Sequence, residues 1–224
     1  MKGLFITFEG PEGGGKSTHV ARLAQRLRHL GYDVVTTREP GGTPAGEAIR
    51  DVIQHDKRSE NLSSETETLL FLASRAQLVQ SVILPALKKG NCVISDRFSD
   101  STIAYQGYGR GMNVQALFML NKFATGSVSP DLTLLLDINV KRGFMRLRKR
   151  NRKNNASHDR IERESLMFHE KVRGGYLKLA GKWSKRYRII DAGQSMKQVE
   201  KSIWAVVCKR LGKLRRRLKA VYVP

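Results

Sequence analysis

The fold of this chain is limited above all by one octet near its start, GPEGGGKS at residues 10–17. The octet fits the pattern G-x-x-x-x-G-K-[ST] of a phosphate-binding P-loop. An apolar run, LFITF at residues 4–8, precedes it, and apolar residues at helical spacing follow between Ser17 and Leu30. A bare match arises by chance in flexible glycine turns, but a loop between a strand and a helix is the context that the motif requires. We therefore expect backbone N–H groups and a helix N-terminus to hold a phosphate group here.

The rest of the chain alternates between strand-like and helix-like segments. Strands are predicted at residues 4–8, 33–37, 91–95, 132–138 and 186–191. Helices are predicted at residues 17–30, 44–54, 65–89, 113–124, 160–183 and 195–218. Such alternation predicts an α/β fold, with a five-stranded parallel sheet, helices on both faces and right-handed crossovers. No apolar stretch approaches the length needed to cross a bilayer, and the N-terminus does not resemble a secretory signal. A cytoplasmic location is therefore expected.

Ligands of parallel sheets gather at the carboxyl ends of the strands, and polar residues occur at these points in the sequence. Arg38 follows the second strand, and Asp96 and Arg97 follow the third. Asp96 could hold Mg²⁺, and Arg97 could bridge phosphates with its forked donors. A salt bridge at the end of the strand is the alternative for Asp96 and Arg97, and Glu39 could equally be a structural partner of Arg38.

Three further residues suggest contacts to a nucleoside. Glu12 lies inside the P-loop, where a triphosphate would repel its carboxylate, so a sugar hydroxyl is its natural partner. Phe71 and Arg75 lie four residues apart on the predicted helix 65–89 and therefore share a face. The ring could stack on a base and the guanidinium could donate to a base carbonyl. Spacing alone instead favours a core phenylalanine and a surface arginine. His158 and His169 are expected on the surface.

The chain is strongly basic, with 41 Lys and Arg against 20 Asp and Glu and a formal net charge of +21. The electrostatic field of such an excess of positive charge favours anionic partners. One basic cluster, at residues 146–164, is expected to be polar and partly mobile. It could be a solvated face, a nucleic-acid arm or a lid that closes over a transferring phosphoryl group. A second cluster follows Glu200, where Ile203, Val207, Leu211, Leu214 and Leu218 would share one face of a basic helix.

Six segments of the chain together closely resemble the thymidylate kinase family over about residues 3–205. They are FEGPEGGGKST, TREPGGTPAGEAIR, FLASRAQL, DRFSDSTIAYQGYGRG, PDLTLLLDI and DRIE. The resemblance implies a P-loop nucleoside monophosphate kinase fold with a mobile lid, a homodimer, and the transfer of a phosphoryl group from ATP to dTMP with Mg²⁺. The P-loop pattern and the resemblance give the expected ATP-binding residues: Gly10, Pro11, Glu12, Gly13, Gly14, Gly15, Lys16, Ser17 and Thr18. Ser17 and Asp96 are the expected metal ligands.

The resemblance also implies a dTMP site. Phe71 would stack on thymine, Arg75 would donate to its O4 edge, and Glu12 would contact the 3′-hydroxyl. The remaining implied contacts are Arg38 and Arg97 at the dTMP phosphate, Ser101 and Thr102 near the ring, Tyr105 beneath the sugar, and Gln106 beside it. Asp159 and Glu162 match acids that follow the lid, and residues 191–195 match a loop near adenine.

The P-loop contains no arginine, which implies the family arrangement in which the lid supplies the catalytic arginine. Arg146, Arg148 and Arg150 match a lid pattern, and the expected catalytic residues are Lys16, Arg97, Arg148 and Arg150. We expect one kinase domain at residues 1–211, with a lid at about 146–160, and a basic tail at residues 212–224. Compared with the family pattern, the expected lid is longer, because residues 152–157 are inserted before DRIE. The alternatives are a kinase for another nucleotide or nucleoside, and a P-loop ATPase that binds nucleic acid, which the charge suggests. The tail could contact nucleic acid or an acidic surface.

Overall fold

Five parallel strands form the centre of the fold in the computed structural model of the chain, in the order β2-β3-β1-β4-β5. The structure describes residues 3–54, 62–154 and 159–221, without the side chains of 153–154 and 213–221. The strands are β1 Leu4–Glu9, β2 Val34–Arg38, β3 Cys92–Asp96, β4 Leu132–Asp137 and β5 Tyr187–Asp191. Each lies within one residue of its predicted bounds. The predicted five-stranded parallel sheet is confirmed.

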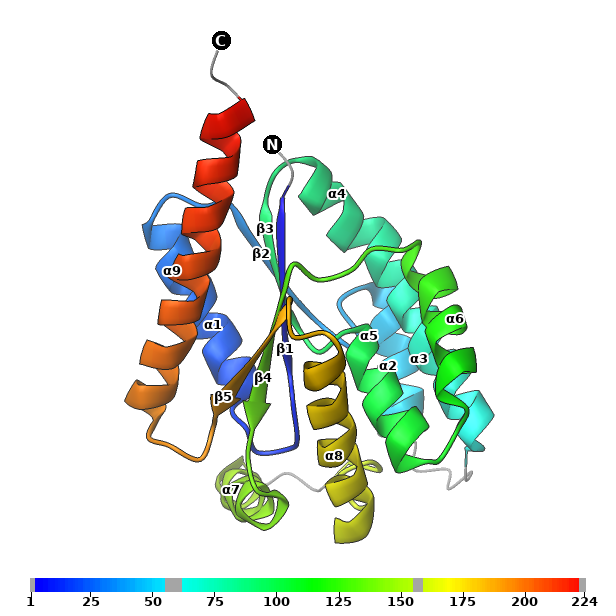
Figure 1. The fold of residues 1–224 in the computed structure, drawn as a ribbon. Coiled ribbons are helices and arrows are strands. Elements are labelled where there is room, and N and C mark those ends of the chain that lie inside the picture. Colours follow the sequence, from blue (N-terminus) through cyan, green and yellow to red (C-terminus); the bar gives the residue numbers. More distant parts are fainter. Residues whose placement is uncertain (1–2, 55–61, 155–158, 222–224) are drawn as a thin grey trace.

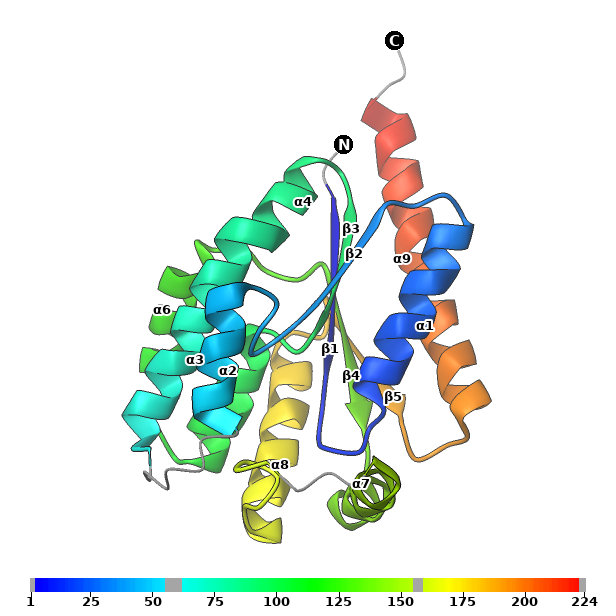
Figure 2. The ribbon, with the colours of Figure 1, turned by 180° about the vertical axis from the view of Figure 1, so that it is seen from behind.

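Helices cover both faces of the sheet (Figure 1). The helices at one face are α1 Lys16–His29 and α9 Met196–Val221. Those at the other face are α2 Pro44–Gln54, α3 Ser64–Leu78, η1 Val79–Ile83, α4 Leu84–Lys88, α5 Ser99–Thr102, η2 Ile103–Gly109, α6 Val114–Thr125 and α8 Leu166–Lys182. Figure 2 shows the same two layers from behind, with α1 and α9 side by side.

The strand side chains divide between the two faces because successive residues of a strand point in opposite directions. Leu4, Ile6 and Phe8 belong to the core cluster that also contains residues of α1 and α9. Phe5 belongs instead to the cluster that contains Leu78 of α3. The sheet is therefore buried on both faces, as the apolar strand sequences predict.

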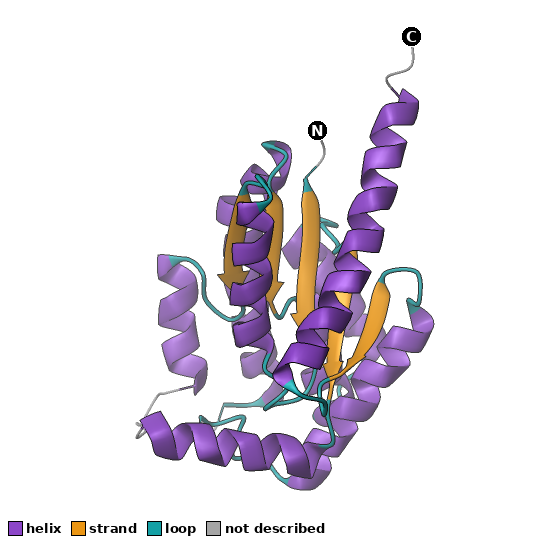
Figure 3. Cartoon of the chain, turned by 90° about the vertical axis from the view of Figure 1, so that its left-hand side faces the viewer, coloured by secondary structure: helices purple, strands orange, loops and turns teal. Residues whose placement is uncertain are grey.

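The basic segment after β4 forms a helix, α7 Val140–Asn154, although no regular structure was predicted there. This helix lies across the edge of the sheet at which the strands end (Figure 3). Val140, Gly143, Leu147 and Asn151 are buried, at a spacing that places them on one side of a helix. Arginine and lysine are good helix formers, so a dense charge run is compatible with a helix once one side is apolar or small.

The predicted helix 65–89 is continuous but changes character before Pro85, through the π-helical segment η1. Proline has no N–H to donate and its ring crowds the carbonyl four residues earlier, so regular α-helical pairing is lost just before it. Ser63 caps the start of the helix by accepting a hydrogen bond from the Thr66 N–H at 3.1 Å.

One helical stretch among the described residues, Ser64–Lys88, is long and apolar enough to cross a membrane by length and composition alone. The expectation that no such stretch exists was wrong. Leu78, Val79 and Ile83 of this stretch lie in the core beneath the sheet, and Arg75 of the same stretch is buried in an ion pair with Glu39. The packing is that of a core helix.

Candidate active site

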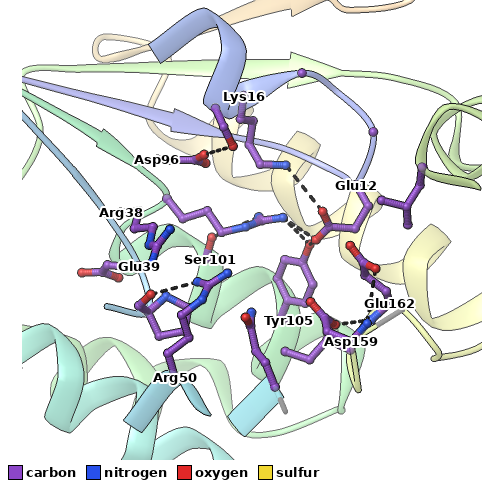
Figure 4. Close-up of a pocket in the computed structure, with 18 of the residues that line it drawn as sticks. Glu12, Lys16, Arg38, Glu39, Arg50, Asp96, Ser101, Tyr105, Asp159 and Glu162 are labelled. Carbon is purple, nitrogen blue, oxygen red and sulfur yellow. Dashed lines mark hydrogen bonds and ion pairs between the residues drawn. The ribbon is translucent and has the colours of Figure 1, made fainter. Parts of the chain in front are cut away.

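A cavity of about 610 Å³ lies at the edge of the sheet where the strands end. β2, β3 and β1 are neighbours in the sheet, so the P-loop, Arg38 and Asp96-Arg97 meet there. Figure 4 shows Lys16, Arg38 and Asp96 around the cavity. Most of the predicted site residues line this cavity: Glu12, Gly13, Gly15, Lys16, Ser17, Thr18, Arg38, Phe71, Asp96, Arg97, Ser101, Thr102, Tyr105, Gln106 and Arg150. Gly10, Pro11, Gly14, Arg75 and Arg148 are not among the lining residues.

The P-loop folds tightly around the Lys16 side chain. Lys16 is buried, and its ammonium group donates to the carbonyl oxygens of Gly10 and Pro11 at 3.1 and 2.8 Å. Gly10 and Gly13 have positive φ angles of 132° and 74°, and a Cβ atom at either would overlap a carbonyl oxygen of β4 or α7. The loop therefore needs glycine at these positions both for its torsions and for its packing.

Ser17 and Asp96 bring two oxygen donors together at the start of α1. The Ser17 hydroxyl donates to Asp96 Oδ2 at 2.5 Å. A hydroxyl and a carboxylate are hard oxygen ligands, and Mg²⁺ in nucleotide enzymes takes one or two such protein ligands beside phosphate oxygens. Among the described residues, no group of three or more His, Cys, Asp or Glu could hold a metal by itself. The donor set fits a magnesium ion that is shared with a nucleotide.

Arg97 and Glu12 form an ion pair between the P-loop and the end of β3. The Tyr105 hydroxyl donates to Glu12 at 2.8 Å and accepts from Arg97 at 2.9 Å. Burial would raise the pKa of the Glu12 carboxyl, but the positive charges of Arg97 and Lys16 outweigh it and lower that pKa to about 2. Glu12 is therefore a carboxylate at neutral pH and can accept a hydrogen bond.

Arg38 and Arg50 present two further cations to the cavity. Arg38 pairs with Glu47 at 2.9 Å and is 55% exposed, whereas Glu39, the alternative partner, pairs with Arg75. Arg50 donates to the Pro40 carbonyl at 2.9 Å. Arg50 was not among the predicted site residues. Arg50 lies on α2 and reaches the cavity only because the turn at Pro40 folds back onto that helix.

Arg75 is 1% exposed, which contradicts the alternative of a surface arginine. Its guanidinium forms an ion pair with the buried Glu39 and donates to the Thr102 hydroxyl and the Asn121 carbonyl oxygen. Phe71, one turn earlier on α3, is half-buried and lines the cavity. Phe71 and Thr102 thus reach the cavity, whereas Arg75 lies behind them.

α7 and the segment after it close one side of the cavity. Arg146 donates to the Ala192 carbonyl at 2.7 Å, in the loop after β5. Arg150 donates to Glu162 at 3.0 Å, and Asp159, Ile161 and Glu162 also line the cavity. Arg148 is exposed on α7. The structure thus brings Arg146 and Arg150 to the cavity together with the two acids of DRIE. The insertion at 152–157 lies mostly outside the described residues.

Two buried groups behind the cavity also escaped the sequence analysis. Glu9, the last residue of β1, accepts hydrogen bonds from the Ser101 and Tyr176 hydroxyls at 2.7 and 2.9 Å. Burial, together with repulsion from Asp100, raises the pKa of the Glu9 carboxyl to about 7. An acidic residue at the end of an otherwise apolar strand was the available signal. His169, expected on the surface, is buried in contact with the rings of Phe144 and Phe168, and His158 lies outside the described residues.

Comparisons with known proteins agree with this geometry. The family model described as thymidylate kinase matches residues 8–203. A thymidylate kinase of Ectopseudomonas mendocina (strain ymp) is 49% identical over 207 residues, which cover 92% of this chain and 96% of that protein. One of Kosmotoga olearia is 46% identical over 212 residues, covering 93% of this chain and 99% of that protein. The crystal structure of a thymidylate kinase from Ehrlichia chaffeensis superposes with a TM-score of 0.73 at 32% identity, and covers 92% of this chain and 99% of that one. A P-loop whose Glu12 pairs with Arg97 at one cavity, together with these matches over nearly the whole length, shows that the chain belongs to the thymidylate kinase family.

Proposed function

We propose that this protein transfers the γ-phosphoryl group of ATP to the 5′-phosphate of dTMP and releases ADP and dTDP. The observation that carries the proposal is that one cavity is lined both by the P-loop and by residues suited to bind a second nucleotide. The P-loop lines one part, and Arg38, Phe71, Arg97 and Tyr105 line the other. Two mononucleotides fit this arrangement with their phosphate groups meeting between Lys16 and Arg97. The family to which the chain belongs supports the same reaction.

On the ATP side, the N–H groups of the P-loop and of the start of α1 would surround the phosphates. Lys16 would leave the carbonyl oxygens of Gly10 and Pro11 and contact the β- and γ-phosphates. Ser17 and Asp96 would hold Mg²⁺, which would neutralise negative charge on the phosphate groups. The loop after β5, which accepts hydrogen bonds from Arg146, would lie near adenine.

On the dTMP side, Phe71 would stack on the base, with Ser101, Thr102 and Gln106 around it. Glu12, held as a carboxylate by Arg97, would accept a hydrogen bond from the 3′-hydroxyl, and the Tyr105 ring would lie beneath the sugar. Arg38 and Arg97 would bind the phosphate. For Arg75 to reach the base, one of its N–H groups would have to turn from Thr102 toward the O4 edge.

The reaction itself needs positioning and charge neutralisation more than proton transfer. The attacking atom is a phosphate oxygen that is already anionic near neutral pH, so no general base is required. Lys16, Arg97 and an arginine of residues 146–160, which we propose act as a lid, would neutralise charge on the transferring group. Closure of that lid would also exclude water, which otherwise hydrolyses ATP.

A coupled ADP-release assay tests this function. With ATP and Mg²⁺, we expect dTMP to be the preferred acceptor in a panel with dUMP, dCMP, dGMP and unphosphorylated thymidine. Use of thymidine alone would contradict the roles of Arg38 and Arg97. ATP turnover that is stimulated by DNA or RNA and independent of dTMP would indicate a nucleic-acid ATPase instead.

We also propose that the protein is a homodimer through the outer surface of α3 and α6. Phe123 and Met119 of α6 are 88% and 69% exposed, and Leu69 of α3 is 59% exposed. Large exposed apolar side chains on packed helices are typical of a protein interface. Placing a carboxylate at the centre of such a patch leaves an unpaired charge buried on association.

Phe123→Glu should therefore weaken dimerisation about 100-fold, a typical loss for a central aromatic residue. Analytical ultracentrifugation over a range of concentrations measures the change. Met167→Glu, on α8 and 68% exposed, is the matched control and should leave the dimer intact. A dimer equally stable in both variants would contradict the proposed surface.

The basic end of α9 is proposed to contact a polyanionic surface. Ile203, Val207 and Leu211 of α9 pack in the core, whereas Leu214, Leu218 and the rest of the tail lie outside the part whose side chains are described. We expect deletion of residues 212–224 to leave kinase activity within twofold. The deletion should also lower retention on heparin more than a variant in which the same number of positive charges is removed from α7. Equal retention of the two would contradict the proposal. We further propose that residues 1–211 form one kinase domain and that the protein is cytoplasmic.

A further inference from the structure

Arg97 has a backbone conformation that arginine rarely adopts. Its φ angle is 70°, in the left-handed region, which is unfavourable for a residue with a side chain. Such a residue persists only where its surroundings fix it, and residues of this kind cluster at functional sites. Its N–H donates to the Phe8 carbonyl at 2.9 Å, and the Ser95 hydroxyl donates to its carbonyl oxygen at 2.6 Å.

Glu9 fixes the backbone of Phe98, the residue that follows Arg97, through a hydrogen bond. The Phe98 N–H donates to Glu9 Oε1 at 2.8 Å. The other carboxylate oxygen, Oε2, accepts from the Ser101 hydroxyl at 2.7 Å and from the Tyr176 hydroxyl at 2.9 Å. Glu9 is fully buried and does not line the cavity. In the ionised form, both oxygens of Glu9 therefore accept hydrogen bonds from groups of the protein.

The two hydroxyl groups that contact Glu9 also contact the Arg97 guanidinium. Arg97 Nη1 donates to the Tyr176 hydroxyl at 3.0 Å and, more weakly, to the Ser101 hydroxyl at 3.4 Å. A hydroxyl has one hydrogen to donate. When the Tyr176 hydroxyl gives that hydrogen to Glu9, its lone pairs face Arg97. The carboxylate thus orients the acceptor on which the arginine rests.

We propose that Glu9 and Tyr176 are positioning residues that hold Arg97, both backbone and side chain, at the acceptor phosphate. The inference rests on the proposed function, in which Arg97 binds the dTMP phosphate. Tyr176 is fully buried on α8 and, like Glu9, is absent from the cavity lining. Three elements far apart in the sequence, β1, α5 and α8, therefore determine where one cation lies.

Tyr176→Phe tests the proposal, because it removes the hydroxyl and keeps the buried ring. We expect the Kd for dTMP to rise about tenfold, as for the loss of a hydrogen bond to a charged group. The Kd for thymidine, which has no phosphate, should stay within twofold, and so should the KM for ATP. Calorimetry gives both dissociation constants, and thermal unfolding shows that the variant is folded.

Glu9→Gln provides a second variant, since an amide has a single acceptor oxygen and cannot serve all three donors. It should weaken dTMP binding without a matching loss for thymidine. Tyr187→Phe is the control, because Tyr187 is buried in the same core cluster and is not among the described hydrogen-bond partners of Arg97. Its affinity for dTMP should be unchanged.

Equal losses for dTMP and thymidine in Tyr176→Phe and Glu9→Gln would overturn the proposal, since they would indicate general damage to the site. Unchanged dTMP affinity in both variants would overturn it as well. Failure of the proposed function has a different signature. In that case the unaltered protein itself would bind dTMP no better than thymidine, or would not phosphorylate it.

Discussion

Lys16→Met should lower kcat for phosphoryl transfer by about 10³-fold while the protein stays folded. The substitution removes the only charge of the side chain and keeps most of its length. Charge builds up on the transferring group in the transition state, and one lost cationic or hydrogen-bonding contact of this kind typically costs 10²–10³-fold or more. Single-turnover kinetics with ATP and dTMP measure the chemical step apart from product release.

The fold should tolerate this change. The hydrogen bonds of Lys16 among the described residues go to carbonyl oxygens of the P-loop, and its ion pair with Glu12 is long, at 3.9 Å. Burial lowers the pKa of its ammonium group. Methionine fills the same space without a charge to desolvate. Lys149→Met, at an exposed position on α7, makes the same change in net charge and should keep kcat within twofold. More than a tenth of the original kcat in Lys16→Met would contradict the assigned role.

The parts of the fold that could be predicted were those that local pattern determines. Apolar runs such as residues 4–8 and 132–138 are long enough to mark buried strands, and Gly31 and Ser63 mark helix ends through their own conformation or hydrogen bonds. α7 was missed because its charge density hides the sparse buried stripe of Val140, Gly143 and Leu147. The π-helical segments could not be predicted, since they depend on how the helix packs around Pro85 and beyond Thr102.

The candidate site was predictable to the extent that strand order determines it. Arg38, Asp96 and the P-loop follow strands that lie side by side, so parallel pairing alone brings them together. The partners of these residues come from packing at long range. Glu39 pairs with Arg75, 36 positions away, and Arg97 meets Tyr176, 79 positions away. No local signal in the sequence links such residues.

Arg150→Ala is the second change for which we expect a large effect, a loss of about 10³-fold in kcat, as for an arginine that contacts the transferring phosphoryl group. Three arginines of α7 matched the lid pattern, and the structure distinguishes them. Arg150 lines the cavity and is held only by Glu162 and its neighbour Asn151 among described residues. Arg146 is engaged with the loop after β5, and Arg148 is exposed outside the lining.

The relative losses of kcat among the variants identify the catalytic arginine, because closure of the lid could bring more than one arginine to the phosphoryl group. Arg148→Ala should lose no more than about tenfold in kcat, and Lys149→Ala, the charge-matched change between them, should lose less than twofold. Since the effect acts on the transition state, the Kd for dTMP should change little in any of the three. A larger loss for Arg148→Ala than for Arg150→Ala would show that closure rotates α7 and that Arg148 reaches the phosphoryl group. Similar small losses in both would mean that neutralisation of the transferring group rests on Lys16 and Arg97 alone.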